Sequence, residues 1–284
     1  MRIVAALAFF GALGLGAGAA SNSSSLDATR CLDGQLYTRS LDAAFRDAES
    51  WQESKGGLWL TAFPWGRSNP TGGDAAYYED PKPGVAQNAF SIASRDTLVL
   101  SARKAQSGDA PHRYISGLIT TGRDSGPATF SQRYGYVEAV AKFPRGRGLW
   151  PAFWLRDSRG KDAEIDVFEF LGDDVTSVYQ SVHYASGGGS SFRYRAPFDP
   201  TKGFHTYGVR IGPDRDTFYV DGLPTHSVRD ASVNGLYIIV SMQVGAPGSW
   251  PGPPDEATHW PASLEIRAIR AYTPANGPCE ASQP

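Results

Sequence analysis

The sequence predicts one all-β domain built as a sandwich of two antiparallel sheets. Twelve strand-like runs follow one another with Gly, Pro, Asp or Asn between most of them, and apolar periodicity of helical length is nearly absent. The 32 Gly and 20 Pro among 284 residues exceed their usual combined share of about 12%. A closed barrel fits the same pattern. We prefer a sandwich because 7 Trp, 13 Tyr and 14 Phe suit an open concave face on which flat ligands stack.

Residues 1–20 are predicted to be a signal peptide. Arg2 supplies one positive charge, residues 3–18 are almost wholly apolar or Gly, and residues 17–19 (AGA) match the small residues of a cleavage site. A transmembrane helix is the alternative, although the run is short, Gly-rich and without a basic flank after it. We therefore expect residues 21–284 to form a single mature domain that is secreted or periplasmic and has no membrane contact.

The elements of this domain follow in chain order, with one helix and then the strands. The helix candidate is Ser40–Ser50, with Ser40 as its cap. No linker and no repeat period interrupts the strands, which supports a single domain. The predicted strands are residues 58–63, 88–94, 97–104, 115–122, 134–143, 149–156, 163–170, 178–184, 205–212, 216–222, 236–244 and 263–273.

The two cysteines, Cys31 and Cys279, lie near the two ends of the mature chain. An even count in an exported protein predicts a disulfide, which would bring the two ends together in space. Two unpaired thiols are the alternative. Neither cysteine has the spacing of a CxxC motif or of a metal site.

Charge argues against two classes of partner. The net charge is −2 and no Lys/Arg run exceeds two residues, so nothing indicates binding to nucleic acid or to an anionic membrane. We expect a monomer.

The stretch DAEIDVFEF at residues 162–170 places three carboxylates in one strand. Side chains alternate along a strand, so Glu164 and Asp166 share a face, whereas Glu169 lies an odd number of residues away and should face the opposite side. Carboxylates are costly to bury unless they are paired, hydrogen-bonded or used. A β-bulge around Val167–Phe168 would turn Glu169 onto the face of the other two acids.

The runs on either side of the acid strand carry further candidates. Trp150 and Trp154 share one face of their strand and can form a floor for a ring, although a core pair of Trp fits equally well. Tyr179 and His183 share a polar face of the next strand. A lone His is usually structural, but consecutive strands of a sandwich often pair, which would bring these residues next to the acids.

Two carboxyl groups on one face suit glycoside hydrolysis, in which one attacks the anomeric carbon and the other protonates the leaving oxygen. In retaining enzymes the groups lie about 5–5.5 Å apart. A flat strand would separate the Cα atoms of Glu164 and Glu169 by roughly 13 Å, so the side chains must converge on a curved sheet. The charge of Asp166 between them should raise the pKa of the acid.

The sequence EIDVFEFLG resembles the E-x-D-x-x-E signature of glycoside hydrolase family 16, in the bulged form of laminarinases, agarases and carrageenases. Further blocks resemble family landmarks in the same order: NAFSIAS, ISGLITTG, YGYVEAVAKFPRGRGLWPAFWL, SVHY, FHTYGVRIGPDRDTFYVDG and VGAPGSWPGPPDEATHWPASLEI. The resemblance implies a concanavalin-like jelly roll with a concave substrate cleft, and endo-hydrolysis of a β-linked polysaccharide by double displacement with retention.

The resemblance also implies roles for individual residues. Glu164 would be the nucleophile, Asp166 the assisting carboxylate and Glu169 the general acid/base. The other matched positions would bind substrate: Trp150, Trp154, His183, Asn88, Tyr114, Gln243 and Trp250. VGAPGSW replaces the more usual double glycine before Trp250. We expect no cofactor and no metal ligand; some relatives bind structural calcium on the convex side, but nothing in this sequence identifies such a site.

The sequence leaves alternatives open for the substrate and for the class of function. A β-1,3- or mixed β-1,3/1,4-glucan and an exopolysaccharide made by the same bacterial cell fit about equally, and galactans come third because no basic cluster suits sulfated chains. A lectin using only the Trp floor would not need three clustered acids. A calcium site is disfavoured because its ligands usually come from loops.

Overall fold

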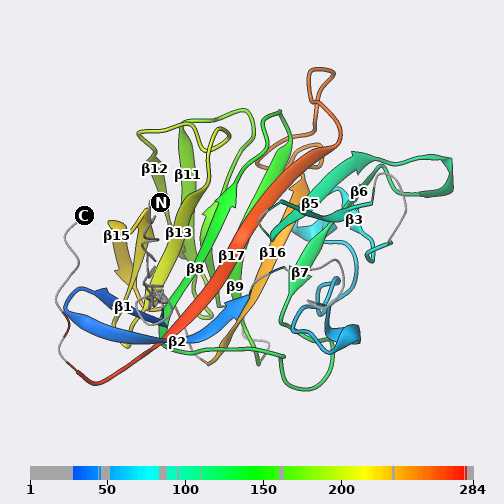
Figure 1. Ribbon diagram of the computed structural model, residues 1–284. Coiled ribbons are helices and arrows are strands. Elements are labelled where there is room, and N and C mark those ends of the chain that lie inside the picture. The colour runs from blue at the N-terminus through cyan, green and yellow to red at the C-terminus, as the bar shows by residue number, and fades with distance from the viewer. Residues whose placement is uncertain are drawn as a thin grey trace, which may run out of the picture.

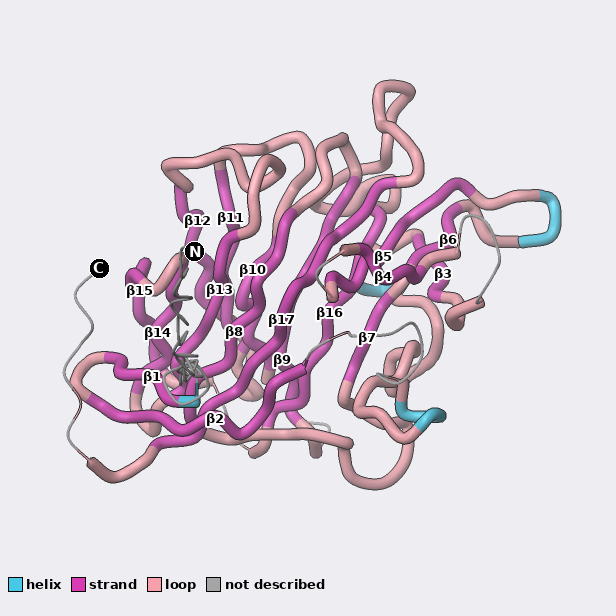
Figure 2. The backbone as a smooth tube through the Cα atoms, in the orientation of Figure 1, coloured by secondary structure: helices cyan, strands magenta, loops and turns pink. Residues whose placement is uncertain are grey.

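Two β-sheets packed against each other contain most of the described chain (Figure 1). The computed structural model describes residues 28–43, 45, 52–82, 88–94, 96–109, 111–159, 163–231, 234–277 and 279. Figure 2 shows that strands dominate and that only short helical turns interrupt the loops. The predicted all-β sandwich is therefore confirmed.

The large sheet has eleven strands, eight of which follow the order β15-β14-β13-β8-β17-β5-β6-β3. Of the other three, β4 pairs with β5, β2 pairs with β17, and β1 pairs with β2. All pairs are antiparallel except β3 with β6, which is parallel. Its strands are β1 Thr29–Leu32, β2 Gln35–Ala43, β3 Ala76–Tyr78, β4 Phe90–Ala93, β5 Thr97–Lys104, β6 Tyr114–Ser116, β8 Gly135–Lys142, β13 His205–Ile211, β14 Arg215–Val220, β15 Leu223–Arg229 and β17 Ala262–Pro274.

The small sheet has six strands in the order β12-β11-β10-β9-β16-β7, all antiparallel. Because β12 and β7 form the two ends of this order, the sheet does not close, and the barrel alternative is wrong. The strands are β7 Leu118–Thr120, β9 Leu149–Asp157, β10 Glu164–Glu169, β11 Ser177–His183, β12 Gly189–Arg195 and β16 Leu236–Val244; three short 3-10 turns are η2 Glu53–Lys55, η3 Pro70–Gly72 and η4 Ser107–Asp109.

The core lies between the sheets and fixes which way β10 faces. The ring of Phe168 on β10 lies 5.8 Å from Phe153 on β9 and 5.2 Å from Tyr207 on β13 of the large sheet. The central strands β9 and β16 are buried at almost every position, and large side chains such as Trp150 and Trp154 cover much of their cleft face. One face of β10 therefore packs into the core, and the other is left for the cleft.

Most predicted strands are confirmed, with two differences. Residues 58–63 form only isolated bridges, from Trp59 to Gln52 and from Leu60 to Thr120. The predicted strand 115–122 divides at Gly117 into β6 and β7, which belong to different sheets. A Cβ on Gly117 would lie 2.7 Å from the backbone oxygen of Ala89, so the chain passes between the sheets at a residue without a side chain.

The predicted helix Ser40–Ser50 is wrong where it can be compared, because Ser40–Ala43 belongs to β2. That strand pairs with the long strand β17, and this pairing overrides a helical pattern that has no buried face of its own. Residues 46–50 lie outside the described residues. The missed strands β1, β3, β12 and β15 are short or mostly exposed, so they lack the alternation that marks a strand.

The predicted disulfide between Cys31 and Cys279 is confirmed, with Cα atoms 5.7 Å apart. The two cysteines are 248 residues apart in the sequence, so the bond closes a long loop and links β1 to the segment that contains Cys279. Arg30, next to Cys31, also donates at 2.9 Å to Glu138 of β8, which is only 1% exposed. Together these contacts hold the β1–β2 hairpin on the large sheet, and the long closed loop lowers the entropy of the unfolded chain.

The predicted signal peptide at residues 1–20 lies outside the described residues. Among the residues that are described, none of the helices has the length and apolar character to cross a membrane.

Candidate active site

A β-bulge in β10 is present at the predicted position. Asp166 pairs with Trp154 of β9, and the next paired residue is Phe168, opposite Phe153. Val167 is the extra residue between them. The ladder to β11 shifts over the same stretch.

The bulge exchanges the faces of the two residues that follow it. Phe168 packs into the core, and its ring lies 4.7 Å from that of Phe143. Glu169 instead joins Glu164 and Asp166 in the lining of one cleft of about 290 Å³. The odd spacing in the sequence thus produces three carboxyl groups on one surface.

The register gives each acid two neighbours, one from each adjacent strand. These pairs set the chemical environment of each carboxyl group, because directly opposed side chains lie close together. The pairs are Arg156 and His183 beside Glu164, Trp154 and Ser181 beside Asp166, and Ala152 and Tyr179 beside Glu169.

Asp166 is buried and is bonded to His183. The imidazole Nε2 lies 3.2 Å from Asp166 Oδ2. Burial raises the pKa of Asp166, and the bond from His183 opposes this rise. The same bond raises the pKa of His183 against the effect of its own burial. The contact therefore favours a protonated imidazole beside the Asp166 carboxyl group.

Glu169 lies in the environment of a proton donor. Burial raises its pKa well above the ordinary value, and the charges of Asp166 and Glu164 raise it further. The indole Nε1 of Trp150 donates to Glu169 Oε1 at 2.9 Å and acts in the opposite direction. Glu169 thus keeps its proton to a higher pH than a free carboxyl group does, and the indole fixes its orientation.

Glu164 lies in the opposite environment, between two cationic groups. Arg156 Nη1 is 3.5 Å from Oε2, and His183 Nε2 is 4.0 Å from Oε1. Cations at this distance favour a carboxylate. One strand therefore carries an anion and a proton donor on the same surface, which is the arrangement needed for paired nucleophilic and acid/base chemistry.

Aromatic residues border the cleft. Trp150 and Trp154 line it, although each exposes less than a tenth of its surface (9% and 5%). Trp250 is 52% exposed and lies edge-on to Trp150 at 6.0 Å and to Tyr179 at 4.8 Å. The predicted Trp floor is therefore a mixture of core packing and cleft surface, with Trp250 as an exposed rim.

Of the remaining predicted binding residues, some line the cleft and others lie elsewhere. Gln243 lines the cleft from β16, opposite Trp150. Asn88 does not: its amide donates to the carbonyl of Lys82 at 2.7 Å and accepts from the backbone N–H of Phe90 at 3.1 Å. These bonds close the loop at the start of β4, which is a structural role.

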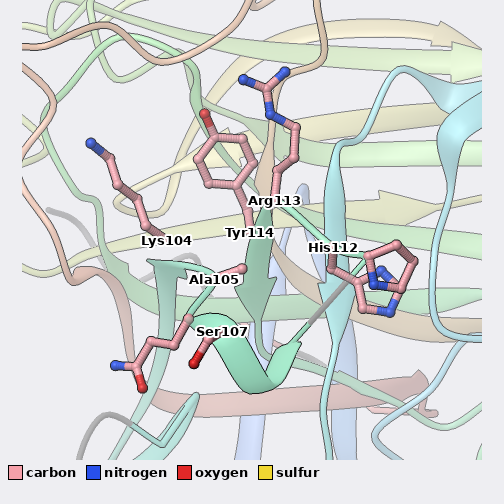
Figure 3. Close-up of a pocket in the computed structure, with 8 residues that line it drawn as sticks. Lys104, Ala105, Ser107, His112, Arg113 and Tyr114 are labelled. Atoms are coloured by element: carbon pink, nitrogen blue, oxygen red, sulfur yellow. The ribbon is translucent and has the colours of Figure 1, made fainter.

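Tyr114 also lies elsewhere, in a shallow groove of about 520 Å³ beside the β5–β6 hairpin (Figure 3). Its ring stacks on Trp260 at 5.3 Å. Figure 3 shows Lys104, Arg113 and Tyr114 extending to the same side of this hairpin. The groove is larger than the cleft, but no carboxyl group is among its described lining residues, so this groove lacks the acid pair that the cleft has.

Some lining residues were absent from the sequence prediction. Arg156 continues the alternation of Trp150 and Trp154 on β9, so its spacing was a usable signal. The other wall comes from a loop of Asn69, Thr71 and Gly72, for which the sequence offers no comparable pattern.

Asp74 joins that loop to the small sheet. Its buried carboxylate accepts from the backbone N–H of Ala76 at 2.9 Å and of Val244 at 3.1 Å, and from the hydroxyl of Tyr78 at 2.5 Å. Val244 follows Gln243 on β16. Burial raises the pKa of Asp74 to about 6.

Glu164, Asp166 and His183 also meet the distance requirement of a cation site, with one donor atom from each within 4.8 Å of the others. Calcium usually takes 6–8 oxygen ligands, many of them from loops. Here one donor is an imidazole and all three come from two paired strands, which fits a hydrogen-bonded catalytic group better. The expectation of no cofactor and no metal ligand stays a prediction.

Comparison with known proteins supports the same chemistry. A sequence profile of glycosyl hydrolases family 16 matches residues 82–266, more than half of the chain. Two endo-1,3-1,4-beta-glycanases of Rhizobium meliloti (strain 1021) are similar: EglC is 28% identical over 256 residues (85% of this chain, 53% of EglC), and ExsH is 29% identical over 230 residues (76% and 48%). The chain spans about half the length of these curated relatives.

Solved structures agree with the fold. The endo-β-1,3-glucanase of Pyrococcus furiosus is 28% identical with a TM-score of 0.71, over 88% of this chain and 99% of that one. The laminarinase catalytic domain of Thermotoga maritima MSB8 is 26% identical with a TM-score of 0.70, over 84% and 99%.

The environment of Asp74 predicts a pH-dependent stability. Between about pH 4 and pH 6 the unfolded chain releases this proton while the folded protein retains it, so stability is lost as the pH rises. Asp74→Asn does not titrate and keeps one acceptor oxygen. The free energy of unfolding of the wild type relative to Asp74→Asn should therefore fall by on the order of 3 kcal/mol across this range.

Urea unfolding at pH 4 and pH 7 measures this difference, with the exposed Asp214→Asn as the matched control. If the free energies of unfolding of wild type and Asp74→Asn differ by the same amount at both pH values, Asp74 is not the titrating group.

Proposed function

Because the chain belongs to glycosyl hydrolases family 16, we propose that it is an endo-acting, retaining glycosidase that cleaves a β-1,3- or mixed β-1,3/1,4-glucan. The observation that carries the proposal is the bulged strand β10, which brings Glu164 and Glu169 to one cleft in opposite electrostatic environments.

The two half-reactions follow from these environments. In the first, the Glu164 carboxylate attacks the anomeric carbon while Glu169 gives its proton to the glycosidic oxygen, so the C–O bond breaks and a glycosyl ester forms on Glu164. In the second, Glu169 takes a proton from water, and the resulting hydroxide displaces Glu164. Two inversions give net retention.

Asp166 supports both steps without forming a bond to the sugar. Its charge helps to raise the pKa of Glu169, and its bond to His183 holds the imidazole Nε2 4.0 Å from Glu164 Oε1. Formation of the ester in the first step removes the negative charge of Glu164, so the pKa of Glu169 falls and its carboxylate can accept a proton from water in the second step.

The substrate class is argued from the lining of the cleft. The described lining contains a single arginine, Arg156, which already contacts Glu164. A sulfated or otherwise anionic chain needs a cluster of cations, so the cleft favours an uncharged glucan. The names of the R. meliloti and P. furiosus relatives point to the same β-1,3 and β-1,3/1,4 linkages.

The proposal extends to localisation. A disulfide such as Cys31–Cys279 persists in oxidising compartments, which supports a secreted or periplasmic protein. We further propose that the protein acts as a monomer. The chemistry above uses only carboxyl groups and water, and we propose that it needs no cofactor.

Activity on a panel of polysaccharides tests the function. Wild type should release reducing sugar from laminarin or lichenan more than from agarose or a bacterial exopolysaccharide, and Glu164→Gln should lose more than about 1,000-fold in rate because it cannot form the ester. Glu265→Gln on β17 of the large sheet is the matched control. Binding without release by the wild type would favour the lectin alternative, and an active Glu164→Gln would exclude Glu164 as the nucleophile.

A second prediction concerns Glu169. Glu169→Ala should lose most activity on polysaccharide, because the leaving oxygen is no longer protonated, yet form the glycosyl ester from an aryl glycoside whose leaving group needs no proton. Azide should then restore turnover and yield a β-glycosyl azide. A folded variant that azide does not rescue would assign the acid/base role to another group.

A further inference from the structure

We propose that Arg156 is a positioning residue for the nucleophile: its guanidinium, held against the indole of Trp65, orients the Glu164 carboxylate toward the anomeric carbon. The inference rests on the proposed function above, since it assumes that Glu164 is the attacking group. It concerns a side chain and a loop to which the acid signature gives no role.

The backbone places Arg156 directly beside Glu164. The two residues are opposed in the β9–β10 ladder, upstream of the bulge, where the register is regular. Nη1 of Arg156 is 3.5 Å from Oε2 of Glu164, so the cation lies on one side of the carboxylate. The other oxygen, Oε1, faces His183 at 4.0 Å. The carboxylate is thus held from both sides.

A stack of rings supports the guanidinium. Its central carbon lies 4.8 Å from the centroid of Trp65. The Trp65 ring is parallel to that of Phe63, at 4.7 Å and 6°. Phe63 is 3% exposed and meets Tyr78 edge-on at 5.0 Å. The stack therefore connects the core to the side of Arg156, and a planar cation on an aromatic face loses little freedom when it binds a carboxylate.

Charge makes the two flanking cations unequal. Arginine stays protonated at every pH at which the protein is folded, whereas His183 is an imidazole that can lose its proton and whose Nε2 contacts Asp166. In the described part of the chain, the other titratable groups near Glu164 include Asp166 and Glu169 on its own strand and Tyr237 of β16, whose pKa burial raises to about 12. Arg156 is therefore the permanent positive charge among these neighbours.

A direct sugar-binding role for Arg156 and Trp65 is the competing explanation, and kinetics separate the two. A positioning residue changes kcat and the acidic limb of the pH profile, whereas a residue that only binds sugar changes KM. Trp65 acts through Arg156 in the proposal, so its substitution should have no further effect once Arg156 is absent.

The test uses wild type, Arg156→Gln, Arg156→Lys, Trp65→Ala and the Arg156→Gln/Trp65→Ala double variant, on laminarin and on an aryl β-laminaribioside. Arg156→Gln should lower kcat by on the order of 10- to 100-fold with KM within about twofold, because the nucleophile is misplaced. Its acidic limb should move to higher pH by about one unit. Arg156→Lys should return the acidic limb to its wild-type position but restore only part of kcat. Trp65→Ala should lower kcat by less than Arg156→Gln does. The double variant should be no slower than Arg156→Gln.

Several results would overturn the inference. A raised KM with an unchanged kcat and acidic limb in Arg156→Gln would make Arg156 a sugar-binding residue. Independent, multiplicative losses in the double variant would show that Trp65 does not act through Arg156. Arg215→Gln on β14 is exposed and is the matched control.

A substrate-free measurement separates this inference from the proposed function. The Glu164 carboxyl carbon, assigned by its absence in Glu164→Gln, is followed by NMR titration in wild type and in Arg156→Gln. A midpoint at higher pH in Arg156→Gln supports the contact whether or not the panel detects hydrolysis. Identical midpoints would overturn the inference even in an active glycosidase. An inactive wild type would count against the function alone.

Discussion

One residue outside the strand ladder, Val167, determines what chemistry the small sheet can perform. In a regular strand Phe168 would occupy the cleft and Glu169 would be buried between the sheets. The extra residue exchanges them, so that Phe168 packs on Phe143 and Tyr207 while Glu169 reaches the cleft. Core packing and the acid pair thus depend on the same backbone irregularity. Without the bulge, the Glu169 carboxylate would be buried between the sheets and Phe168 would be exposed to solvent. Both changes are unfavourable in free energy, so the bulged register is strongly preferred.

The bulge provides proximity, and the flanking strands make the two glutamates chemically different. Glu169 is partly buried, accepts a hydrogen bond from the indole of Trp150 and lies near the negative charge of Asp166. Glu164 lies five positions earlier on the same strand, beside Arg156 and His183. Because the two strands that supply these partners are themselves fixed by pairing in the sheet, the difference between the acids is preset and needs no movement of the protein.

Sequence reasoning worked where a local pattern has one physical solution. Three acids at a spacing of odd parity in an apolar strand share one face only through a bulge, and two cysteines near the ends of the mature chain favour a disulfide between them. It failed where pairing with a segment distant in the sequence determines the structure. Ser40–Ala43 is a strand because β17 lies beside it, and Asn88 and Tyr114 lie outside the cleft because their segments belong to the large sheet rather than the small one. The Asn69–Gly72 wall could not be found at all, since its position depends on Asp74 bonding to Val244, 170 residues away.

The most direct test of the account is to identify the residue that carries the glycosyl group. A 2-deoxy-2-fluoro-laminaribiosyl fluoride should inactivate the wild type by forming a stable ester, and peptide mapping by mass spectrometry should place that ester on Glu164. Retained reaction at Glu164 in Glu169→Ala would further separate the two roles. An ester on Asp166 or Glu169, with Glu164 unmodified, would contradict the assignment that the bulge and the charge pattern support.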